Sequence, residues 1–240
     1  MNPRGTRVRR WLPIALGAAL AIACAPSTAS ADFIYSISEG NSAIVSYPGP
    51  YASVTVHLID STHASFTVQG LTQTSNNVTY HYLMGDGSTV ALNVNASSFT
   101  LVGSVTGSQP GTGIPSAGNG PYTANIGGSQ NVSAFGDFNF TIDSFDGAGH
   151  ASSTVSFELQ NTSGGTWSSA SSVLTPNNNL FSAADHIYVY NSDYTLNPAT
   201  GFAGDSGGIN PIPEPSSIAL GLAGLLGFGA RKAWRRWRKA

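Results

Sequence analysis

Residues 155–160 read Val-Ser-Phe-Glu-Leu-Gln, a strict alternation of apolar and polar side chains. Successive side chains of an extended strand point to opposite faces, so this stretch places its apolar side chains on one face of a sheet. The same period of two recurs in residues 51–59, 65–69 and 137–143. No convincing helical stripe interrupts it between residues 32 and 203. The sequence therefore predicts an all-β body, which we expect to be a β-sandwich or jelly roll.

Turn-forming residues separate these runs. Asp86-Gly87 and Asp146-Gly147 are typical of turns between strands. Residues 107–131 are rich in Gly, Pro, Ser and Asn and predict a long loop. The only cysteine is Cys24, so the body must be held by an apolar core and not by disulfides.

Charge is distributed very unevenly along the chain. No Lys or Arg occurs from Ala31 through Ser217, whereas all 12 acidic residues lie in that stretch. A body without cationic side chains cannot neutralise phosphates, which excludes nucleic acid as a partner. It also lacks the lysines that commonly protect sheet edges, so we expect bulges, loops or partners to do so.

The first 31 residues are typical of a secretory signal peptide. Arginines precede an apolar run from Trp11 to Ala23, and the small residues Ala29 and Ala31 predict cleavage before Asp32. The expected partners are the secretion translocon and a signal peptidase. An alternative interpretation makes Cys24 a lipoprotein cysteine, because the residue before it is small.

The other end combines a proline-rich motif, an apolar run and a basic tail. Prolines mark the start of a predicted transmembrane helix at about residues 216–230, which would be about 22 Å long against roughly 30 Å of hydrocarbon. Basic residues favour the cytoplasmic side, which predicts a single-pass inner-membrane intermediate with a cytoplasmic C-terminus and an external body. The motif is Pro213, Glu214, Pro215 and Ser216, and the basic residues are Arg231, Lys232, Arg235, Arg236, Arg238 and Lys239.

This arrangement resembles the PEP-CTERM sorting signal of Gram-negative bacteria. The resemblance covers the last thirty or so residues and implies recognition by an exosortase, a membrane protease-transpeptidase that cuts near the motif. It also implies expression alongside exopolysaccharide production, with Pro213, Glu214 and Pro215 as substrate residues. The alternative is an ordinary C-terminal anchor with a chance pair of prolines. The expected division is a signal peptide (1–31), an ectodomain (32–203), a flexible linker (204–212) and a sorting signal (213–240, with a basic tail at 231–240).

One short segment suggests hydrolase chemistry. Residues 204–208 read Gly-Asp-Ser-Gly-Gly, which looks like the nucleophile segment of trypsin-like serine proteases. A nucleophilic Ser206 would need a histidine base, and neither His57 nor His186 has the expected sequence context. We interpret the segment as a tether and expect no catalytic residue and no enzymatic activity. A secreted serine hydrolase using Ser206 is the remote alternative.

Oxygen-bearing side chains at residues 137–146 suggest calcium, which takes six to eight oxygen ligands. Residues 137–143 alternate along a strand, which spreads them over about 20 Å. Asp143 and Asp146 are therefore only weak calcium candidates, and we expect no cofactor. The leading hypothesis is a non-enzymatic surface or extracellular-matrix protein associated with exopolysaccharide or biofilm. The alternative is a calcium-dependent or lectin-like carbohydrate-binding sandwich.

Overall fold

The structure is a computed structural model that describes residues 32–108, 120–144, 147–191 and 196–206. These residues form strands joined by turns and two short 3-10 helices, and no α-helix occurs among them. The strands are β1 (Phe33–Gly40), β2 (Ala52–Leu58), β3 (His63–Gly70), β4 (Thr72–Ser75), β5 (Val78–Met84), β6 (Val90–Leu92), β7 (Phe99–Ser108), β8 (Thr123–Val132), β9 (Gly136–Asp143), β10 (Thr154–Asn161), β11 (Ala183–Tyr190) and β12 (Leu196–Asp205). The 3-10 helices are η1 (Ala148–His150) and η2 (Ala170–Ser172).

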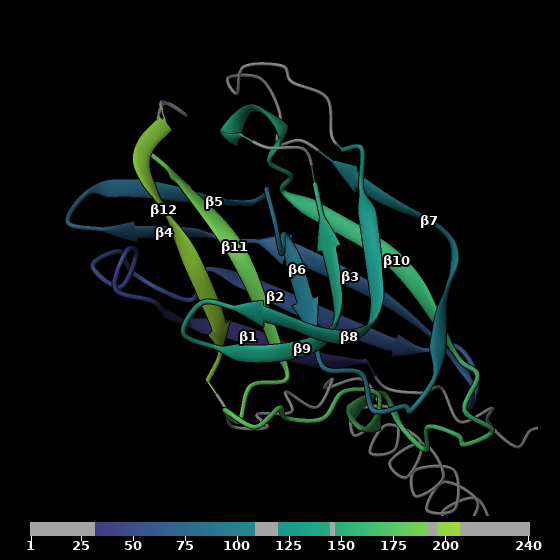
Figure 1. The fold of residues 1–240 in the computed structure, drawn as a ribbon. Helices are drawn as coiled ribbons and strands as arrows, with labels where there is room; N and C mark the ends of the chain where they lie inside the picture. The colour runs from purple at the N-terminus through teal and green to yellow at the C-terminus, as the bar shows by residue number, and fades with distance from the viewer. Residues whose placement is uncertain (1–31, 109–119, 145–146, 192–195, 207–240) are drawn as a thin grey trace, which may run out of the picture.

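All the strands pair antiparallel within one 12-stranded sheet. Its order is β7-β10-β3-β2-β1-β12-β11-β6-β9-β8, and the β4–β5 hairpin joins through β5 and β11. The sheet curls so that its two halves face each other and its end strands, β7 and β8, approach without pairing (Figure 1). The predicted all-β class is confirmed. The two separate sheets of a sandwich are not found, because β12 hydrogen-bonds to both β1 and β11 and joins the two halves in one barrel-like sheet.

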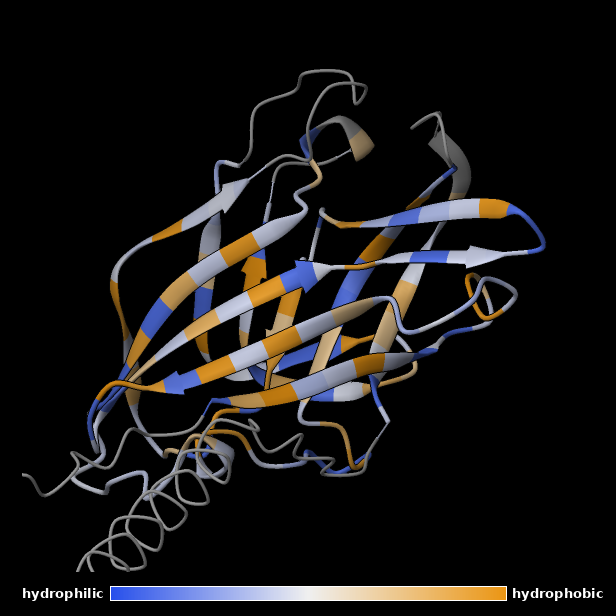
Figure 2. Ribbon diagram, turned by 180° about the vertical axis from the view of Figure 1, so that it is seen from behind, coloured by the Kyte–Doolittle hydropathy of each residue, from blue (hydrophilic) through white to orange (hydrophobic). Residues whose placement is uncertain are grey.

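The period of two places the core as the sequence predicts. In β10 the apolar Val155, Phe157 and Leu159 are buried, as is Asn161 at the strand end, and the polar residues between them are partly exposed. β2 and β3 repeat this alternation, which Figure 2 shows as alternating bands of hydropathy along the strands. Because successive side chains point to opposite faces, the inner face of the sheet is apolar and the outer face is polar.

Aromatic rings from neighbouring strands fill the interior. The rings of Phe66 and Phe157 stack with centroids 4.9 Å apart, and those of Phe140 and Phe157 lie 5.2 Å apart. All three belong to one large cluster that spans both halves of the sheet. A continuous apolar cluster of this kind replaces the disulfides that the body lacks.

The predicted loop at residues 107–131 is partly wrong. β7 extends to Ser108 and β8 begins at Thr123, and only residues 109–122 separate the two strands. β8 was missed because it is mostly exposed and rich in Gly, Ser and Asn, so it has no apolar alternation. Its pairing with β9 supplies the order that its own side chains do not indicate. The predicted turn at Asp86-Gly87 is confirmed between β5 and β6.

Glycine bulges interrupt both end strands of the sheet. The pairing of β7 with β10 slips across Gly103, whose φ is 71°. The pairing of β8 with β9 slips across Gly127 and Gly128, with φ of 74° and 80°. A bulge twists an edge and stops a further strand from pairing regularly with it. This agrees with the expectation that edges without lysine need another form of protection.

The predicted linker begins too early in the sequence. Gly204 and Asp205 are the last residues of β12, whose neighbours are β1 and β11. The folded body therefore extends to Asp205 and not to residue 203. The Gly-Asp-Ser-Gly-Gly segment looks flexible by composition, but Gly204 pairs with both β1 and β11, and Asp205 pairs with β1.

Several predicted segments lie outside the described residues: the signal peptide at 1–31, most of the linker, and the sorting signal at 213–240 with its helix at 216–230. Among the residues that are described, no helix is long and apolar enough to cross a membrane.

Candidate functional site

The sorting and processing residues predicted from the sequence cannot be placed in the fold. The cleavage residues Ala29 and Ala31, the motif at 213–216 and the basic residues of the tail all lie outside the described residues. The nearest described position is Ser206, one residue after β12. Only the five residues 206–210 separate Asp205 from Pro211, so the chain can reach at most about 20 Å from the end of the barrel to Pro211.

The structure does not assemble a catalytic group around Ser206. His57 lies on β2 with its Nδ1 atom 2.5 Å from a carboxylate oxygen of Asp32. His186 lies on β11 with its Nε2 atom 2.8 Å from the hydroxyl of Thr200. Within the described part of the chain, neither histidine is hydrogen-bonded to Ser206. The base required by the hydrolase alternative therefore has no support from this geometry.

Asp143 is engaged in the fold and is not brought to other ligands. Its Oδ1 accepts the N–H of Ser88 at 2.7 Å, and its Oδ2 accepts the side-chain amide of Asn125 at 2.8 Å. These bonds tie the β5–β6 turn and β8 to the end of β9. Asp146 lies outside the described residues. In the described ranges no group of three or more His, Cys, Asp or Glu side chains could hold a metal.

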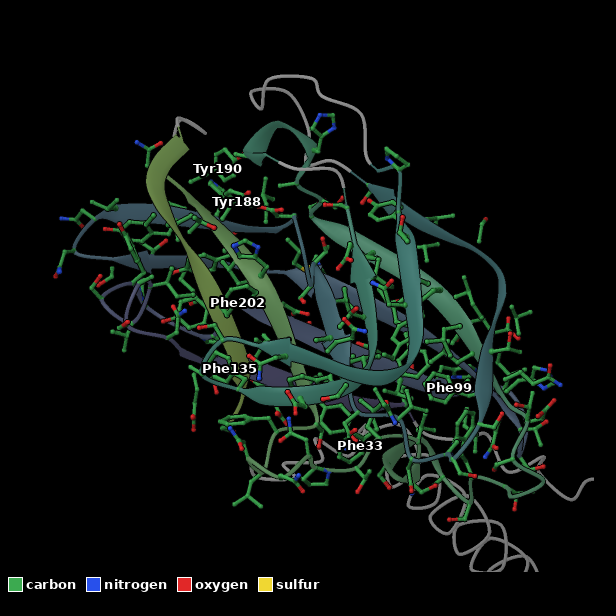
Figure 3. The ribbon with its side chains drawn as sticks, viewed as in Figure 1. Phe33, Phe99, Phe135, Tyr188, Tyr190 and Phe202 are labelled. Carbon is green, nitrogen blue, oxygen red and sulfur yellow. The ribbon has the colours of Figure 1, made fainter. Side chains whose placement is uncertain are left out.

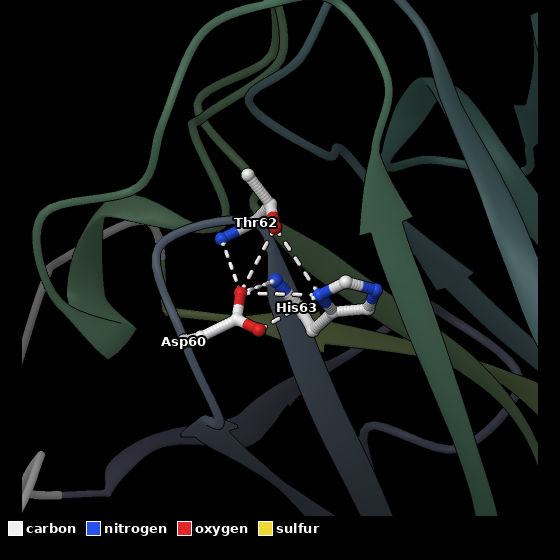
Figure 4. Close-up of polar contacts among 3 residues, drawn as sticks. All are labelled: Asp60, Thr62 and His63. Carbon is white, nitrogen blue, oxygen red and sulfur yellow. Dashed lines mark hydrogen bonds and ion pairs between the residues drawn. The ribbon is translucent and has the colours of Figure 1, made fainter.

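An exposed cluster in the turn between β2 and β3 also resembles a catalytic arrangement (Figure 4). Asp60 Oδ1 accepts the N–H groups of Thr62 at 2.7 Å and His63 at 2.8 Å, and also the Thr62 hydroxyl at 2.9 Å. His63 Nδ1 lies 3.0 Å from Asp60 Oδ2. These bonds are local and hold the turn in the manner of an Asx turn, so the cluster is structural. The N–H of Thr62 and then the His63 side chain lower the pKa of Asp60 below its usual range.

An acid-side prediction follows for Asp60. Because the folded state lowers the pKa of Asp60, the ionised carboxylate contributes stability above its ordinary pKa of 3.8. That contribution is lost as the pH falls through the lower folded value. Asp60→Asn is expected to flatten the decline of stability below about pH 4, as measured by urea denaturation of the full-length chain from pH 2 to 5. Equal acid slopes in the two proteins would contradict this role.

The strongest electrostatic anomaly is a pair of buried carboxyl groups that sequence reasoning missed. Asp185 lies on β11 at an interior position between Ala183 and Ile187, and it is fully buried. Asp205, at the end of β12, is 4% exposed and accepts the N–H of Ser182 at 2.9 Å. The period-two pattern of residues 183–189 could have revealed Asp185, because it occupies an inward position in an apolar strand.

The two carboxyl groups differ in their hydrogen bonding. Neither oxygen of Asp185 has a hydrogen-bond partner among the described residues, whereas Asp205 also accepts the N–H of Ala183 at 3.3 Å. Burial, and then the charge of Asp205, raise the pKa of Asp185 well above its ordinary value. Burial raises the pKa of Asp205 to about 6, although backbone N–H groups favour its ionised form. The proton of the pair therefore resides on Asp185.

Among the described residues, no opposite charge acts on the pair. Tyr35 of β1 is close enough for Asp205 to raise its pKa further, although burial is the larger cause. The other charge that acts on Asp205 is Glu39, which again disfavours ionisation. Two neighbouring acids whose pKa values are pushed apart can perform acid–base catalysis when a substrate reaches them. Asp185 is fully buried, so we assign to the pair an effect on how stability depends on pH and not a chemical role.

The outward face of β11 and β12 is lined with aromatic side chains (Figure 3). The ring of His186 stacks on Phe202 at 4.4 Å and on Tyr188 at 5.4 Å. Phe135 packs into a second cluster beside Phe202, and burial lowers the pKa of His186. These rings are mostly buried, because they pack against one another on this half of the exterior.

Comparison with known proteins identifies the C-terminal end. The family model described as the PEP-CTERM protein-sorting motif matches residues 211–236. No curated protein and no solved structure matches the chain. The chain carries a PEP-CTERM sorting motif, which makes it an exported protein that an exosortase, a membrane protease, processes on its way through a membrane-anchored intermediate to the cell surface.

Proposed function

We propose that this chain is a non-enzymatic protein of the cell surface or extracellular matrix, which its sorting motif delivers into exopolysaccharide or biofilm. The observation that carries the proposal is the PEP-CTERM match at residues 211–236, placed six residues after the last strand of the body. Two further features support it. The body has no cationic side chain, and its ionisable clusters serve turns and the core.

The proposed topology follows from the two ends of the sequence. The signal peptide at 1–31 directs export, and the apolar run at 216–230 holds the chain in the membrane. The basic tail at 231–240 keeps the C-terminus in the cytoplasm. Because the connection from Asp205 to residue 216 reaches at most about 40 Å, the folded barrel stays within that distance of the membrane surface. Cleavage near Pro213–Ser216 then releases a complete barrel, since β12 ends before the cleavage zone.

Deleting Pro213–Ala240 tests the proposed delivery. We expect the truncated protein to lose the surface or matrix location and to differ in mass at its C-terminus from the processed wild type. Cell fractionation and intact-mass measurement report these two outcomes. Asn210→Ala, just before the matched residues, is the control and should leave both unchanged. An unaltered location and mature mass in the truncated protein would refute exosortase-dependent delivery.

A further inference from the structure

One half of the barrel exterior presents short polar side chains in rows. The outward positions of β2, β3, β10 and β7 are paired strand by strand, so their side chains stand side by side across the sheet. One row extends onto β1. The first row is Thr55, Thr67, Ser156 and Thr106, and the second is Ser36, Ser53, Gln69, Thr154 and Ser108. We call these nine residues the hydroxyl face.

The groups on the hydroxyl face are available to a partner. All nine residues are exposed or half-exposed, and Figure 2 looks onto the strands that carry them. Thr106 donates weakly to the carbonyl of Ser156 at 3.3 Å, and Ser108 lies 3.4 Å from the hydroxyl of Ser153. The side chains of the other seven make no hydrogen bond within the described residues. Each hydroxyl can donate one hydrogen bond and accept others.

The rows repeat at the spacing of the sheet. Neighbouring strands lie about 4.8 Å apart, and successive outward positions on one strand lie about 6.7 Å apart. Exposed sheet faces often carry long charged side chains, but here every member except Gln69 is a serine or threonine. The surface over these four strands is therefore nearly flat, with short and uniformly polar side chains. The aromatic half of the exterior, around Phe202 and Tyr188, has no such rows.

The charge of this surface favours an uncharged partner over an anionic one. No member of the hydroxyl face is charged, and the nearest titratable groups on these strands are His57 and Glu158 at its margin. Residues 32–217 contain no Lys or Arg, so an anionic polymer would meet net repulsion and no cationic contact. An uncharged polymer whose own groups are hydroxyls meets no electrostatic penalty and can exchange hydrogen bonds with each row.

We propose that the hydroxyl face binds a neutral polysaccharide that lies across β2, β3, β10 and β7. Each hydrogen bond contributes little on its own, but a polymer that meets two rows makes many of them at once, directly or through water. This deepens the proposed function by naming the polymer class that retains the delivered barrel. It rests on that function for its biological setting, whereas binding itself is a property of the barrel.

Cosedimentation of the full-length chain, kept soluble in detergent, with cellulose as the neutral probe tests this proposal. The variant Thr55→Val/Thr67→Val/Ser156→Ala removes three hydroxyls of one row and keeps the side chains short and the strand preference high. Its apparent affinity should fall about tenfold or more, because several hydrogen bonds are lost together. Thr67→Ser, which keeps a hydroxyl, should bind like the wild type.

Two controls separate specific binding from other causes. Thr123→Val places the same change on exposed β8, outside the hydroxyl face, and should leave binding unchanged. Thermal unfolding verifies that the triple variant is folded. Equal cellulose binding by the triple variant and the wild type would overturn the proposal. So would the absence of cellulose binding, stronger binding to an anionic polyuronate, or self-association of the chain without polymer binding.

Failure of polymer binding can be distinguished from failure of the proposed sorting to the cell surface. The triple variant retains residues 211–236, so its mature mass and its export should match those of the wild type while its retention in a neutral matrix falls. If the deletion of residues 213–240 changes nothing but cellulose binding depends on the hydroxyl face, the sorting proposal fails and the binding proposal stands.

Discussion

Asp185→Asn is expected to make the protein more stable than the wild type at neutral pH and to flatten its decline of stability above pH 4. The Asp185 carboxyl group is fully buried and has no hydrogen-bond partner in the part of the chain that the structure describes, and its pKa is raised by burial and by Asp205. A raised folded pKa means that the folded state holds a proton that the unfolded state has released. Stability is then greatest below the ordinary pKa of 3.8 and falls as the pH rises towards the folded value.

The expected size follows from proton linkage. One extra bound proton corresponds to about 1.4 kcal/mol per pH unit within that window. For a body of this size this is a fall of about 3–5 °C in Tm for each unit. Asp205 adds a similar slope between pH 3.8 and about 6, and then levels off. The asparagine variant should lack the contribution of Asp185 to this decline.

Thermal or urea denaturation of the full-length chain from pH 4 to 8 measures this effect. Asp60→Asn is the matched control, because it also removes one carboxylate but acts in the opposite direction and at acid pH. Parallel stability curves for the wild type and Asp185→Asn from pH 4 to 8 would show that Asp185 has no raised pKa in the folded protein.

Phe140→Ala is expected to cost about 3–5 kcal/mol, which is a large part of the 5–15 kcal/mol that typically separates folded from unfolded states. Phe140 is completely buried on β9, and its ring contacts Phe157 at 5.2 Å and Phe99 at 6.1 Å between centroids. These two partners come from β10 and β7, on the other half of the curled sheet. Truncation leaves a cavity where the two halves of the sheet meet.

Equilibrium urea denaturation of the full-length chain measures this cost. Val45→Ala is the control, since its side chain is 62% exposed and the change should stay within about 0.5 kcal/mol. A loss of less than about 1 kcal/mol in Phe140→Ala would mean that the two halves of the sheet do not meet through this ring.

Particular strands show how far the sequence could predict the fold. β2, β3, β9 and β10 were predicted because one face of each is buried and the other is exposed, which produces a period of two. β8 was missed because it packs little, and β12 was mistaken in part for a linker because its end is rich in small residues. In both strands, pairing with neighbours supplies the order that composition does not show.

The candidate sites also differ in whether they are formed by consecutive residues or by residues that are far apart along the chain. The sorting motif is read from consecutive residues, so the sequence was sufficient to predict it and the family model confirms it. The hydroxyl face and the Asp185–Asp205 pair each combine residues that are far apart along the chain. The serine hydrolase alternative also depended on remote partners, and Ser206 is not brought to a histidine within the described residues. The calcium alternative depended on the nearby residues 137–146, of which Asp143 is engaged in the fold and Asp146 lies outside the described residues.

By itself, the sequence determined the all-β class, the inward rows of the regular strands, the acidic body without cations, and the sorting motif. Each of these is a local property, written in the order and spacing of neighbouring residues. Only the tertiary structure decided that the strands form one curled sheet, that β12 runs to Asp205, and that two acids are buried near each other. It also decided which outward hydroxyls align in rows. Strand pairing sets these features, and pairing depends on contacts between residues that sequence spacing does not bring together.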